Sequence, residues 1–346
     1  MKRLLIILSL FVALLVPIAL RQMLLLKPSL YIYMWSDYIK PSLIKKFEKK
    51  HDCLVIVDTY DSNESLFTKL QLGGAGYDII FPSNYYLNTM AEKNLLMPIE
   101  RSKIPNLRHV DNNLLRRFSI SDTQWGIPYM VSFSGIAWRT DRLASPPTSW
   151  SLFGNPGLKG RMTMLNDPRE TLGVALRFLG FSANSANPDE ISKARDLIMT
   201  WKPNLAKLES EQYKNGIASA EYLAAHAYNG DTLQLTQDSP HVGFSYPDEG
   251  SLVSFDYAAI LRTCSNPDLS HAFIDFLHDP EIAAENTSFT MYRCVNTTSR
   301  KYLPNHLQNS NILYPEENPE TTFECIQPVG SARREYLLAW DAIKSG

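Results

Sequence analysis

The sequence predicts an α/β protein with two domains and a ligand site at the carboxyl ends of its strands. Three observations support this prediction. The chain has 346 residues, more than most single hydrophobic cores accommodate. Short apolar segments alternate with amphipathic ones, which is typical of a sheet covered by helices. Aromatic and acidic residues follow directly after several apolar segments, where open α/β sheets hold their ligands.

The first such junction lies at residues 31–38. Aromatic side chains at Tyr31, Tyr33 and Trp35 alternate with aliphatic ones, as expected for a strand covered on both faces. Pro41 then suits the first turn of a helix. We therefore expect four residues of this junction at the ligand edge of the sheet, namely Trp35, Ser36, Asp37 and Tyr38.

The following segments repeat the pattern. We predict a helix at 41–51, a strand at 53–60, a helix that follows the capping-type residues 61–64 and ends at Gly73-Gly74, and a strand at 77–81. This βαβαβ order predicts a parallel sheet. The last strand is followed by Ser83, Tyr85 and Tyr86, so we expect these three residues at the same edge.

Weaker signals predict the remaining elements. Asn266 and Asp279 each precede a proline and are expected to cap helices, whereas the segment 228–230 is typical of a helix end and a turn. The predicted strands are 125–138, 161–165, 242–246 and 252–261, and the predicted helices are 168–179, 188–201, 218–228, 267–277, 280–289 and 330–344.

The amino-terminal residues are typical of an export signal. Lys2 and Arg3 precede an uncharged apolar segment from Leu4 to Leu20. No small-x-small cleavage site follows, and about 17 residues is close to the minimum for a membrane span. Residues 1–27 are therefore either a signal peptide or an uncleaved signal anchor.

Composition and motifs exclude several functions. A net charge of −2 provides no general electrostatic reason to bind nucleic acid. Motifs of serine hydrolases, zinc proteases and phosphate loops are absent, so no enzyme class is indicated. The histidines do not cluster and the cysteines lack C-x-x-C spacing, so we predict no metal site. In an exported protein the cysteines form up to two disulfides or remain buried thiols; they are Cys53, Cys264, Cys294 and Cys325.

Two acidic segments require an explanation. Asp167, followed by Pro168 and by Glu170 at the third helical position, fits a helix cap that needs no ligand. Asp256 lies inside an otherwise apolar strand, where an unpaired carboxylate is costly. Either a cationic ligand or an internal arginine or lysine would compensate the charge of Asp256.

A series of short segments carries a family resemblance. In order, they are residues 33–38 (Tyr-Met-Trp-Ser-Asp-Tyr), 60–64, 77–78 with 82–86, 127–129 (Ile-Pro-Tyr), 167–170, 228–230 and Asp256. In this combination, from Leu30 to the carboxyl end, the chain resembles the periplasmic polyamine-binding proteins of ATP-driven spermidine and putrescine importers.

The resemblance implies a type II periplasmic-binding-protein fold, with two α/β lobes and a ligand cleft between them. Residues 28–135 and 256–301 would form lobe 1, and residues 136–255 and 302–346 would form lobe 2. The implied function is a monomeric, non-catalytic periplasmic receptor without a cofactor, which captures spermidine or putrescine and delivers it to an inner-membrane ABC permease. The alternative is a membrane-anchored polyamine sensor on the same fold.

The resemblance also assigns a ligand site. Carboxylates would pair with the ammonium groups of a polyamine, and aromatic rings would cover its methylenes. Three positions depart from the family. The second tryptophan that spermidine-binding members carry before the strand aspartate is either missing or replaced by Phe255 from another face, Tyr228 stands where tryptophan is usual, and Gln327 is displaced by one position. The choice between spermidine and putrescine therefore stays open. The assigned residues are Trp35, Ser36, Asp37, Tyr38, Ser83, Tyr85, Asp167, Glu170, Tyr228, Asp256, Tyr292 and Gln327.

Overall fold

The computed structural model describes residues 27–73, 76–120, 123–315 and 323–346. The predicted signal segment at 1–27 lies outside the described residues except for Lys27, as does Gly74 of the predicted Gly73-Gly74 helix end. Within the described part of the chain, no helix combines the length and the apolar character that a membrane span requires.

The strands form one sheet with the main order β2-β1-β3-β9-β4-β7-β5-β6, while β8 and β10 pair with β4 and β11 pairs with β9. The strands are β1 (Ser29–Trp35), β2 (Leu54–Tyr60), β3 (Ile79–Ile80), β4 (Ile127–Arg139), β5 (Met162–Met164), β6 (Leu205–Leu208), β7 (Ala224–Tyr228), β8 (Val242–Ser245), β9 (Ser251–Ile260), β10 (Arg293–Cys294) and β11 (Phe323–Cys325).

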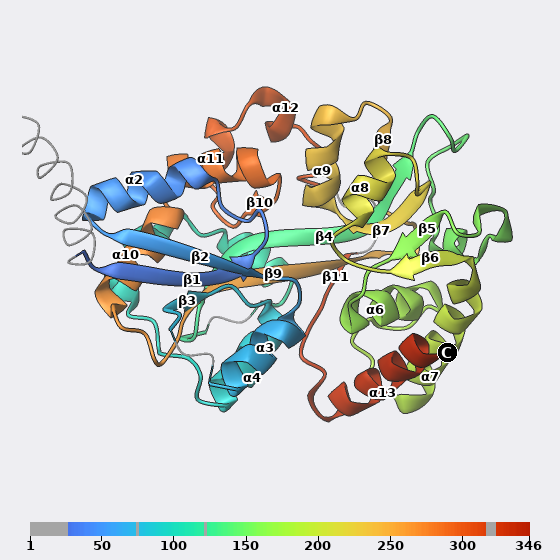
Figure 1. Cartoon of the computed structure of the whole chain (residues 1–346), viewed down its shortest axis with the longest axis horizontal. Helices are drawn as coiled ribbons and strands as arrows, with labels where there is room; N and C mark the ends of the chain where they lie inside the picture. The colour runs from blue at the N-terminus through green and yellow to red at the C-terminus, as the bar shows by residue number, and fades with distance from the viewer. Residues whose placement is uncertain (1–26, 74–75, 121–122, 316–322) are drawn as a thin grey trace, which may run out of the picture.

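Helices cover the sheet in two groups, one at each end of the molecule (Figure 1). They are α2 (Pro41–His51), α3 (Asn63–Gln71), α4 (Asn84–Glu92), α5 (Asn112–Arg117), α6 (Pro168–Phe178), α7 (Pro188–Trp201), α8 (Tyr213–Ala218), α9 (Asn229–Asp238), α10 (Pro267–Leu277), α11 (Pro280–Thr290), α12 (Asn305–Gln308) and α13 (Arg333–Ser345).

Strand direction divides the sheet into parts. β1 is parallel to β2 and to β3, which confirms the predicted βαβαβ unit. β5 is likewise parallel to β6 and β7. Between these parts, β9 is antiparallel to both β3 and β4, so the whole sheet is mixed rather than parallel.

The two long strands β4 and β9 connect the two halves of the molecule (Figure 1). The first part of β4 pairs with β9, as far as Phe133 opposite Val253. From Ser134 onward β4 pairs with β7 and β8 instead. Both strands are buried along their whole length, so the chain crosses between the halves through the core of the sheet.

One predicted helix is wrong. Residues 218–228 include the end of α8 and the whole of strand β7, and Asn229 begins α9 instead of ending a helix. Ala220 has a positive φ of 59°, which an α-helix does not accept. The alanines of β7 are buried between β4 and β5. Packing within the sheet therefore overrides the helical preference of alanine.

Of the two predicted helix caps, Asp279 and Asn266, only Asp279 forms capping hydrogen bonds. Asp279 caps α11, because its side chain accepts hydrogen bonds from the backbone nitrogens of Glu281 and Ile282. Asn266 precedes α10 but its side chain makes no capping bond. Its Nδ2 instead donates to the carbonyl oxygen of Ser29 at 3.0 Å, which ties α10 to β1.

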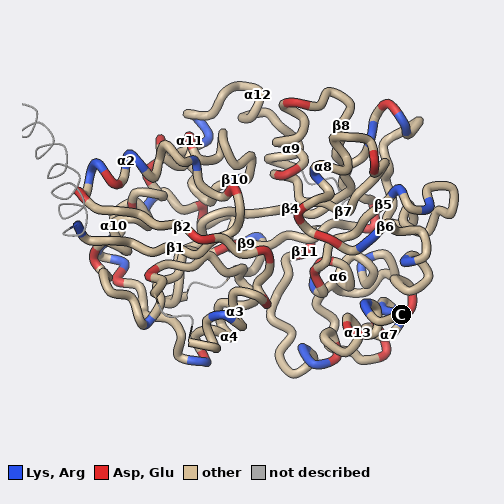
Figure 2. Tube along the Cα trace, in the orientation of Figure 1, with Lys and Arg blue, Asp and Glu red and all other residues tan. Residues whose placement is uncertain are grey.

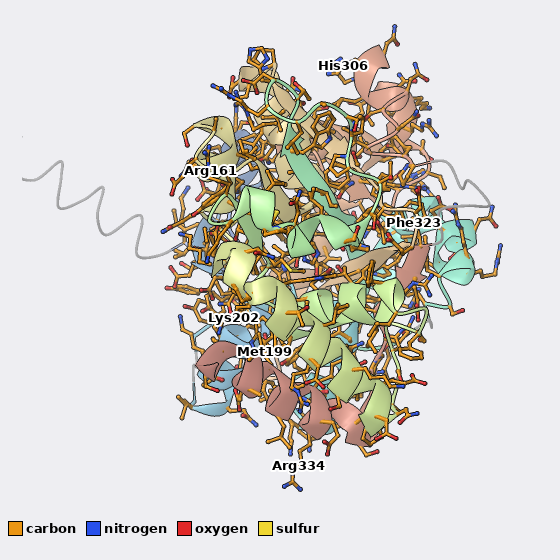
Figure 3. The ribbon with its side chains drawn as sticks, turned by 90° about the vertical axis from the view of Figure 1, so that its right-hand side faces the viewer. Arg161, Met199, Lys202, His306, Phe323 and Arg334 are labelled. Atoms are coloured by element: carbon orange, nitrogen blue, oxygen red, sulfur yellow. The ribbon has the colours of Figure 1, made fainter. Side chains whose placement is uncertain are left out.

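The carboxyl-terminal helix α13 packs against α6 and α7. Its buried side chains include Trp340 and Ile343. Lys202, labelled with Met199 in Figure 3, donates from Nζ to the carbonyl oxygen of Ile343 at 2.5 Å. This bond satisfies a carbonyl near the end of α13, where no further helical turn can do so. The last helix is thereby fixed to the half of the molecule that contains β5, β6 and β7.

Candidate functional site

The junction between β1 and α2 is shaped by a residue in the left-handed region. Asp37 has a φ of 53°, a conformation that aspartate tolerates better than most residues. The turn leaves the Asp37 side chain 67% exposed and directs Tyr38 into the protein. Trp35 is held by a hydrogen bond from its Nε1 to the carbonyl oxygen of Phe81 at 2.9 Å.

Asp256 lies in β9 with only 6% of its surface exposed. The Tyr38 hydroxyl donates to its Oδ2 at 2.5 Å, and the Ser83 hydroxyl donates to its Oδ1 at 2.7 Å. Burial raises the pKa of Asp256 to about 6, although both hydrogen bonds oppose the rise. Among the described residues no lysine or arginine pairs with it, so of the two compensations considered above, the internal cation is not found.

Asp167 performs the predicted capping. Its Oδ1 accepts hydrogen bonds from the backbone nitrogens of Arg169 at 2.7 Å and Glu170 at 3.0 Å. The same side chain lines the pocket described below. Burial is the main cause that raises the pKa of Asp167, and the nearby carboxylates of Glu64 and Glu170 raise it further. Capping therefore explains its position in the helix but leaves a costly buried charge.

Glu170 is the most deeply buried of the three carboxylates, with 2% of its surface exposed. Its Oε2 has no hydrogen-bond partner among the described residues. The nearest basic group is Nε2 of His226 at 3.7 Å, but burial lowers the pKa of that imidazole to about 3, so it is neutral. Burial raises the pKa of Glu170 to about 7. A cationic ligand would relieve this unpaired oxygen.

These carboxylates line one pocket of about 790 Å³, part of which is open to solvent. The pocket lies at the carboxyl end of β1, as expected. Ten predicted residues line it, namely Trp35, Ser36, Tyr38, Ser83, Tyr85, Asp167, Glu170, Tyr228, Asp256 and Tyr292.

Two predicted residues do not line the pocket. Asp37 lies beside it, with Oδ2 at 3.9 Å from Nζ of Lys214. Gln327 is turned away, because its Nε2 donates to the carbonyl oxygen of Phe118 at 3.2 Å and its backbone nitrogen donates to Asn184. The side chain of Gln327 is thus committed to a structural contact.

Tyrosines supply the aromatic surface of the pocket. The rings of Tyr38 and Tyr292 meet edge to face, with centroids 5.7 Å apart. The hydroxyl of Tyr85 accepts a hydrogen bond from Nδ2 of Asn63 at 3.0 Å. Burial raises the pKa of Tyr85 and of Tyr228 well above the ordinary value, so both remain neutral. Neutral rings can cover methylenes and contact cations through their faces.

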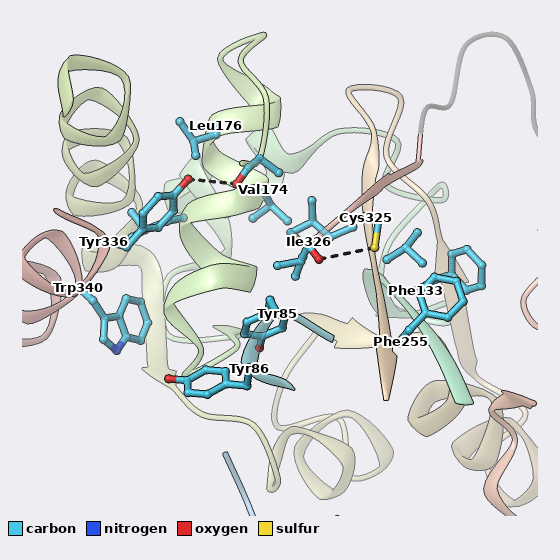
Figure 4. Close-up of a cluster of buried hydrophobic side chains, with 14 of the residues drawn as sticks. Tyr85, Tyr86, Phe133, Val174, Leu176, Phe255, Cys325, Ile326, Tyr336 and Trp340 are labelled. Carbon is cyan, nitrogen blue, oxygen red and sulfur yellow. Dashed lines mark hydrogen bonds between the residues drawn. The ribbon is translucent and has the colours of Figure 1, made fainter. Parts of the chain in front are cut away.

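Phe255 does not replace the tryptophan wall of spermidine-binding members. Its side chain is fully buried in the same hydrophobic cluster as Phe133, and the centroids of the Phe255 and Phe118 rings are 5.8 Å apart. Figure 4 shows Phe255 beside Phe133, within that cluster. Because Phe255 neighbours Asp256 on a strand, it faces the opposite side of the sheet.

A second group of residues that line the pocket was not predicted from the sequence. The most buried acid among them is Asp231, whose carboxylate accepts hydrogen bonds from the hydroxyls of Tyr213 at 2.6 Å and Tyr292 at 2.9 Å. Its position at the start of a helix after a strand would have indicated the site, but the wrong helix at 218–228 concealed this pattern. The missed lining residues are Asp61, Ser62, Asn63, Ser132, Asn166, Ser210, Glu211, Lys214, Asp231 and Ser254.

The charge distribution agrees with a site for cations. Figure 2 shows several acidic positions in the middle of the molecule, where the two halves meet.

The four cysteines are free thiols, so the possible disulfides do not form. His278 is a packing residue, because its Nε2 contacts the carbonyl oxygen of Pro128 at 2.8 Å. In the described part of the chain, no group of side chains is arranged to hold a metal ion.

Residues 42–310 match the family model of the bacterial extracellular solute-binding proteins. The chain belongs to this family. Its two-lobed α/β fold is confirmed by the solved structure of the spermidine/putrescine ABC transporter substrate-binding protein PotD from Streptococcus pneumoniae. That structure has a TM-score of 0.78 and 26% identity, covering 92% of this chain and 99% of the other.

Two curated members of the family are similar over nearly the whole chain. The putrescine-binding periplasmic protein SpuD of Pseudomonas aeruginosa is 30% identical, with 92% of each chain covered. The spermidine/putrescine-binding periplasmic protein of Escherichia coli is 29% identical, also with 92% of each chain covered.

Proposed function

We propose that the protein captures a polyamine, spermidine or putrescine, in the pocket between its lobes and delivers it to an inner-membrane ABC permease. One observation carries the proposal. The pocket is lined by three carboxylates that form no ion pair with a lysine or arginine among the described residues, together with several tyrosine rings; Glu170 and Asp256 are buried, and Asp167 is half-buried. A chain of methylenes with ammonium groups complements both features. The names of the two curated relatives support the same ligand class.

The ligand would join the two lobes. On the predicted boundaries, 28–135 with 256–301 and 136–255 with 302–346, Asp256 belongs to lobe 1, and Asp167 and Glu170 belong to lobe 2. One ammonium group would pair with Asp256, and another with Glu170 and Asp167. Each buried ammonium needs such a partner, since an unpaired buried charge costs more than an aromatic contact contributes.

Isothermal titration calorimetry of the full-length chain in detergent tests the proposal directly. Putrescine and spermidine should both bind, and 1,4-butanediol, which has the length of putrescine without its charges, should not. Equal binding of the diol, or no heat with either polyamine at millimolar concentration, would contradict the proposed function.

We further propose that the protein acts in the periplasm as a monomer and releases its ligand chemically unchanged. Periplasmic relatives support the location. Size-exclusion chromatography with light scattering checks the monomer, and chromatography of the polyamine after incubation checks that no product forms.

The amino-terminal segment distinguishes a free receptor from a tethered one. Leu4 to Leu20 is uncharged and Arg21 follows at once, without a small-x-small site, which supports retention as an anchor in the inner membrane. Amino-terminal sequencing of the protein from cells tests this proposal. Loss of polyamine uptake on deletion supports the importer, whereas unchanged uptake with a lost transcriptional or signalling response supports the anchored sensor.

A further inference from the structure

The pocket contains a positive charge of its own. Lys214 of α8 is the only lysine or arginine among the described residues that line it. Its Nζ lies 3.9 Å from Oδ2 of Asp37 and 3.9 Å from Oδ1 of Asp231. Asp37 follows β1, whereas Lys214 and Asp231 come from α8 and α9 in the other half of the molecule. The ammonium group of Lys214 therefore lies between acids from both halves.

The carboxylates of the pocket form two sets. Asp167, Glu170 and Asp256, the inner carboxylates, form no ion pair with a lysine or arginine among the described residues; Glu170 and Asp256 are buried, and Asp167 is half-buried. A second set, the outer carboxylates, consists of Asp37 and Asp231, which lie 3.9 Å from Nζ of Lys214, and of Asp61 and Glu211, which line the same pocket as Lys214. Burial is the main cause that raises the pKa of Glu211, the charge of Lys214 lowers this pKa, and the other acids of the set raise it.

We infer that Lys214 is a specificity-determining residue, which lies between Asp37 and Asp231 so that the site accepts a diamine in preference to a triamine. This inference rests on the proposed function and narrows its substrate class. The two ammonium groups of a diamine use the inner carboxylates. A third ammonium group, extended toward Asp37 and Asp231, meets the like charge of Lys214, which already lies between these two carboxylates.

The contacts of Asp231 make this arrangement rigid. Its two oxygens accept hydrogen bonds from Tyr213 and Tyr292, so it cannot turn toward a new ammonium group without breaking one of them. A third cation would therefore have to displace Lys214 from its position, which costs the pairing that Lys214 makes with acids of both halves.

Substitution of Lys214 tests the inference by calorimetry on the full-length chain with putrescine and spermidine. The wild type should bind putrescine more tightly. Lys214→Met keeps the length of the side chain and removes its charge, and we expect the ratio of the spermidine Kd to the putrescine Kd to fall at least about tenfold. Lys214→Arg, which retains the charge, should keep the wild-type preference.

A matched control lies on the same half of the molecule. Lys207 is exposed, bonds to Gln212 at 2.8 Å and does not line the pocket, so Lys207→Met should leave the ratio unchanged. Lys214→Gln serves as a second uncharged variant if Lys214→Met folds poorly. If the wild type prefers spermidine, or if the ratio of the spermidine Kd to the putrescine Kd is unchanged in a folded, uncharged variant, the inference about Lys214 is wrong but the proposed function stands. Failure of the wild type to bind either polyamine overturns the proposed function as well.

Discussion

Glu170 shows most clearly what the site costs the protein. Glu170 is 2% exposed, one of its oxygens is unpaired, and the histidine beside it is neutral. The charge of Arg169 only partly offsets the rise in pKa that burial causes, so the ionised carboxylate destabilises the ligand-free fold. Residues of this kind persist where a ligand compensates the charge. At the residue scale, the Glu170 carboxylate therefore marks the site, because its charge serves ligand binding and opposes folding.

We predict that Glu170→Gln stabilises the ligand-free protein at pH 8 and not at pH 4.5. The folded protein raises the pKa of Glu170 from 4.5 to about 7, so the folded state holds the proton more tightly. Wild-type stability falls as the pH rises between these values, by at most about 3 kcal/mol, and the glutamine avoids this loss.

Urea unfolding at both pH values measures this effect, and calorimetry of the same variant should show weaker polyamine binding. Glu92→Gln, at an exposed position of α4, is the control that should change neither quantity. A variant that is less stable than the wild type at pH 8 would show that Glu170 has a structural partner.

Asp256 yields a second prediction at this scale. Asp256→Asn keeps the shape of the side chain but removes the charge, and we expect polyamine binding to weaken at least tenfold, about 1.4 kcal/mol. Calorimetry measures the change. Asp268→Asn is the control, because Asp268 is exposed and pairs with Lys103 on the surface. Wild-type affinity in Asp256→Asn would place the ligand elsewhere in the pocket.

At the scale of elements, the first turn of α6 combines two tasks. Asp167 caps the helix through two backbone nitrogens, and its carboxylate also lines the pocket. Asparagine caps helices about as well as aspartate, whereas alanine does not. The two tasks can therefore be separated by choosing the substitution.

We predict that Asp167→Asn and Asp167→Ala both weaken polyamine binding, and that Asp167→Ala, which also loses the helix cap, is less stable than Asp167→Asn by about 0.5–2 kcal/mol. Urea unfolding and calorimetry give the two quantities. Asp279 caps α11 in the same way outside the pocket, so Asp279→Ala should lose stability but keep binding. If Asp167→Asn binds polyamine as tightly as the wild type, Asp167 acts only as a helix cap.

At the scale of the whole molecule, the halves are joined through β4 and β9, which change partners near Phe133 and Val253. The chain therefore needs no covalent cross-link between its halves. Although the amino terminus is typical of export, all four cysteines are free, and Cys53, Cys294 and Cys325 are buried.

We accordingly predict that the protein, purified without reductant, has four reactive thiols after denaturation. Ellman's reagent in guanidinium chloride counts them, and a sample reduced beforehand is the control. Reductant should also leave the melting temperature unchanged, because no disulfide constrains the unfolded chain. A count of two or of none would show that disulfides form.

Particular residues show how far sequence reasoning reached. The strand-to-helix junction placed Trp35, Ser36 and Tyr38 correctly at the end of β1, because local alternation and a proline are sufficient signals. Residues 218–228 were assigned wrongly, since an alanine-rich segment is compatible with a helix and only its burial between strands makes it β7. That error also concealed Asp231, which lies in the first turn of α9 directly after β7, whereas Lys214 has no pattern of its own.

The sequence by itself determined the α/β alternation, the first three parallel strands and the acidic, aromatic character of the site, because these depend on residues close together in the chain. Only the tertiary structure decided which groups meet. Tyr38 and Asp256 are 218 positions apart, and Lys214 reaches acids from both halves of the molecule. Burial, which shifts the pKa of each inner carboxylate, likewise exists only when distant segments pack together.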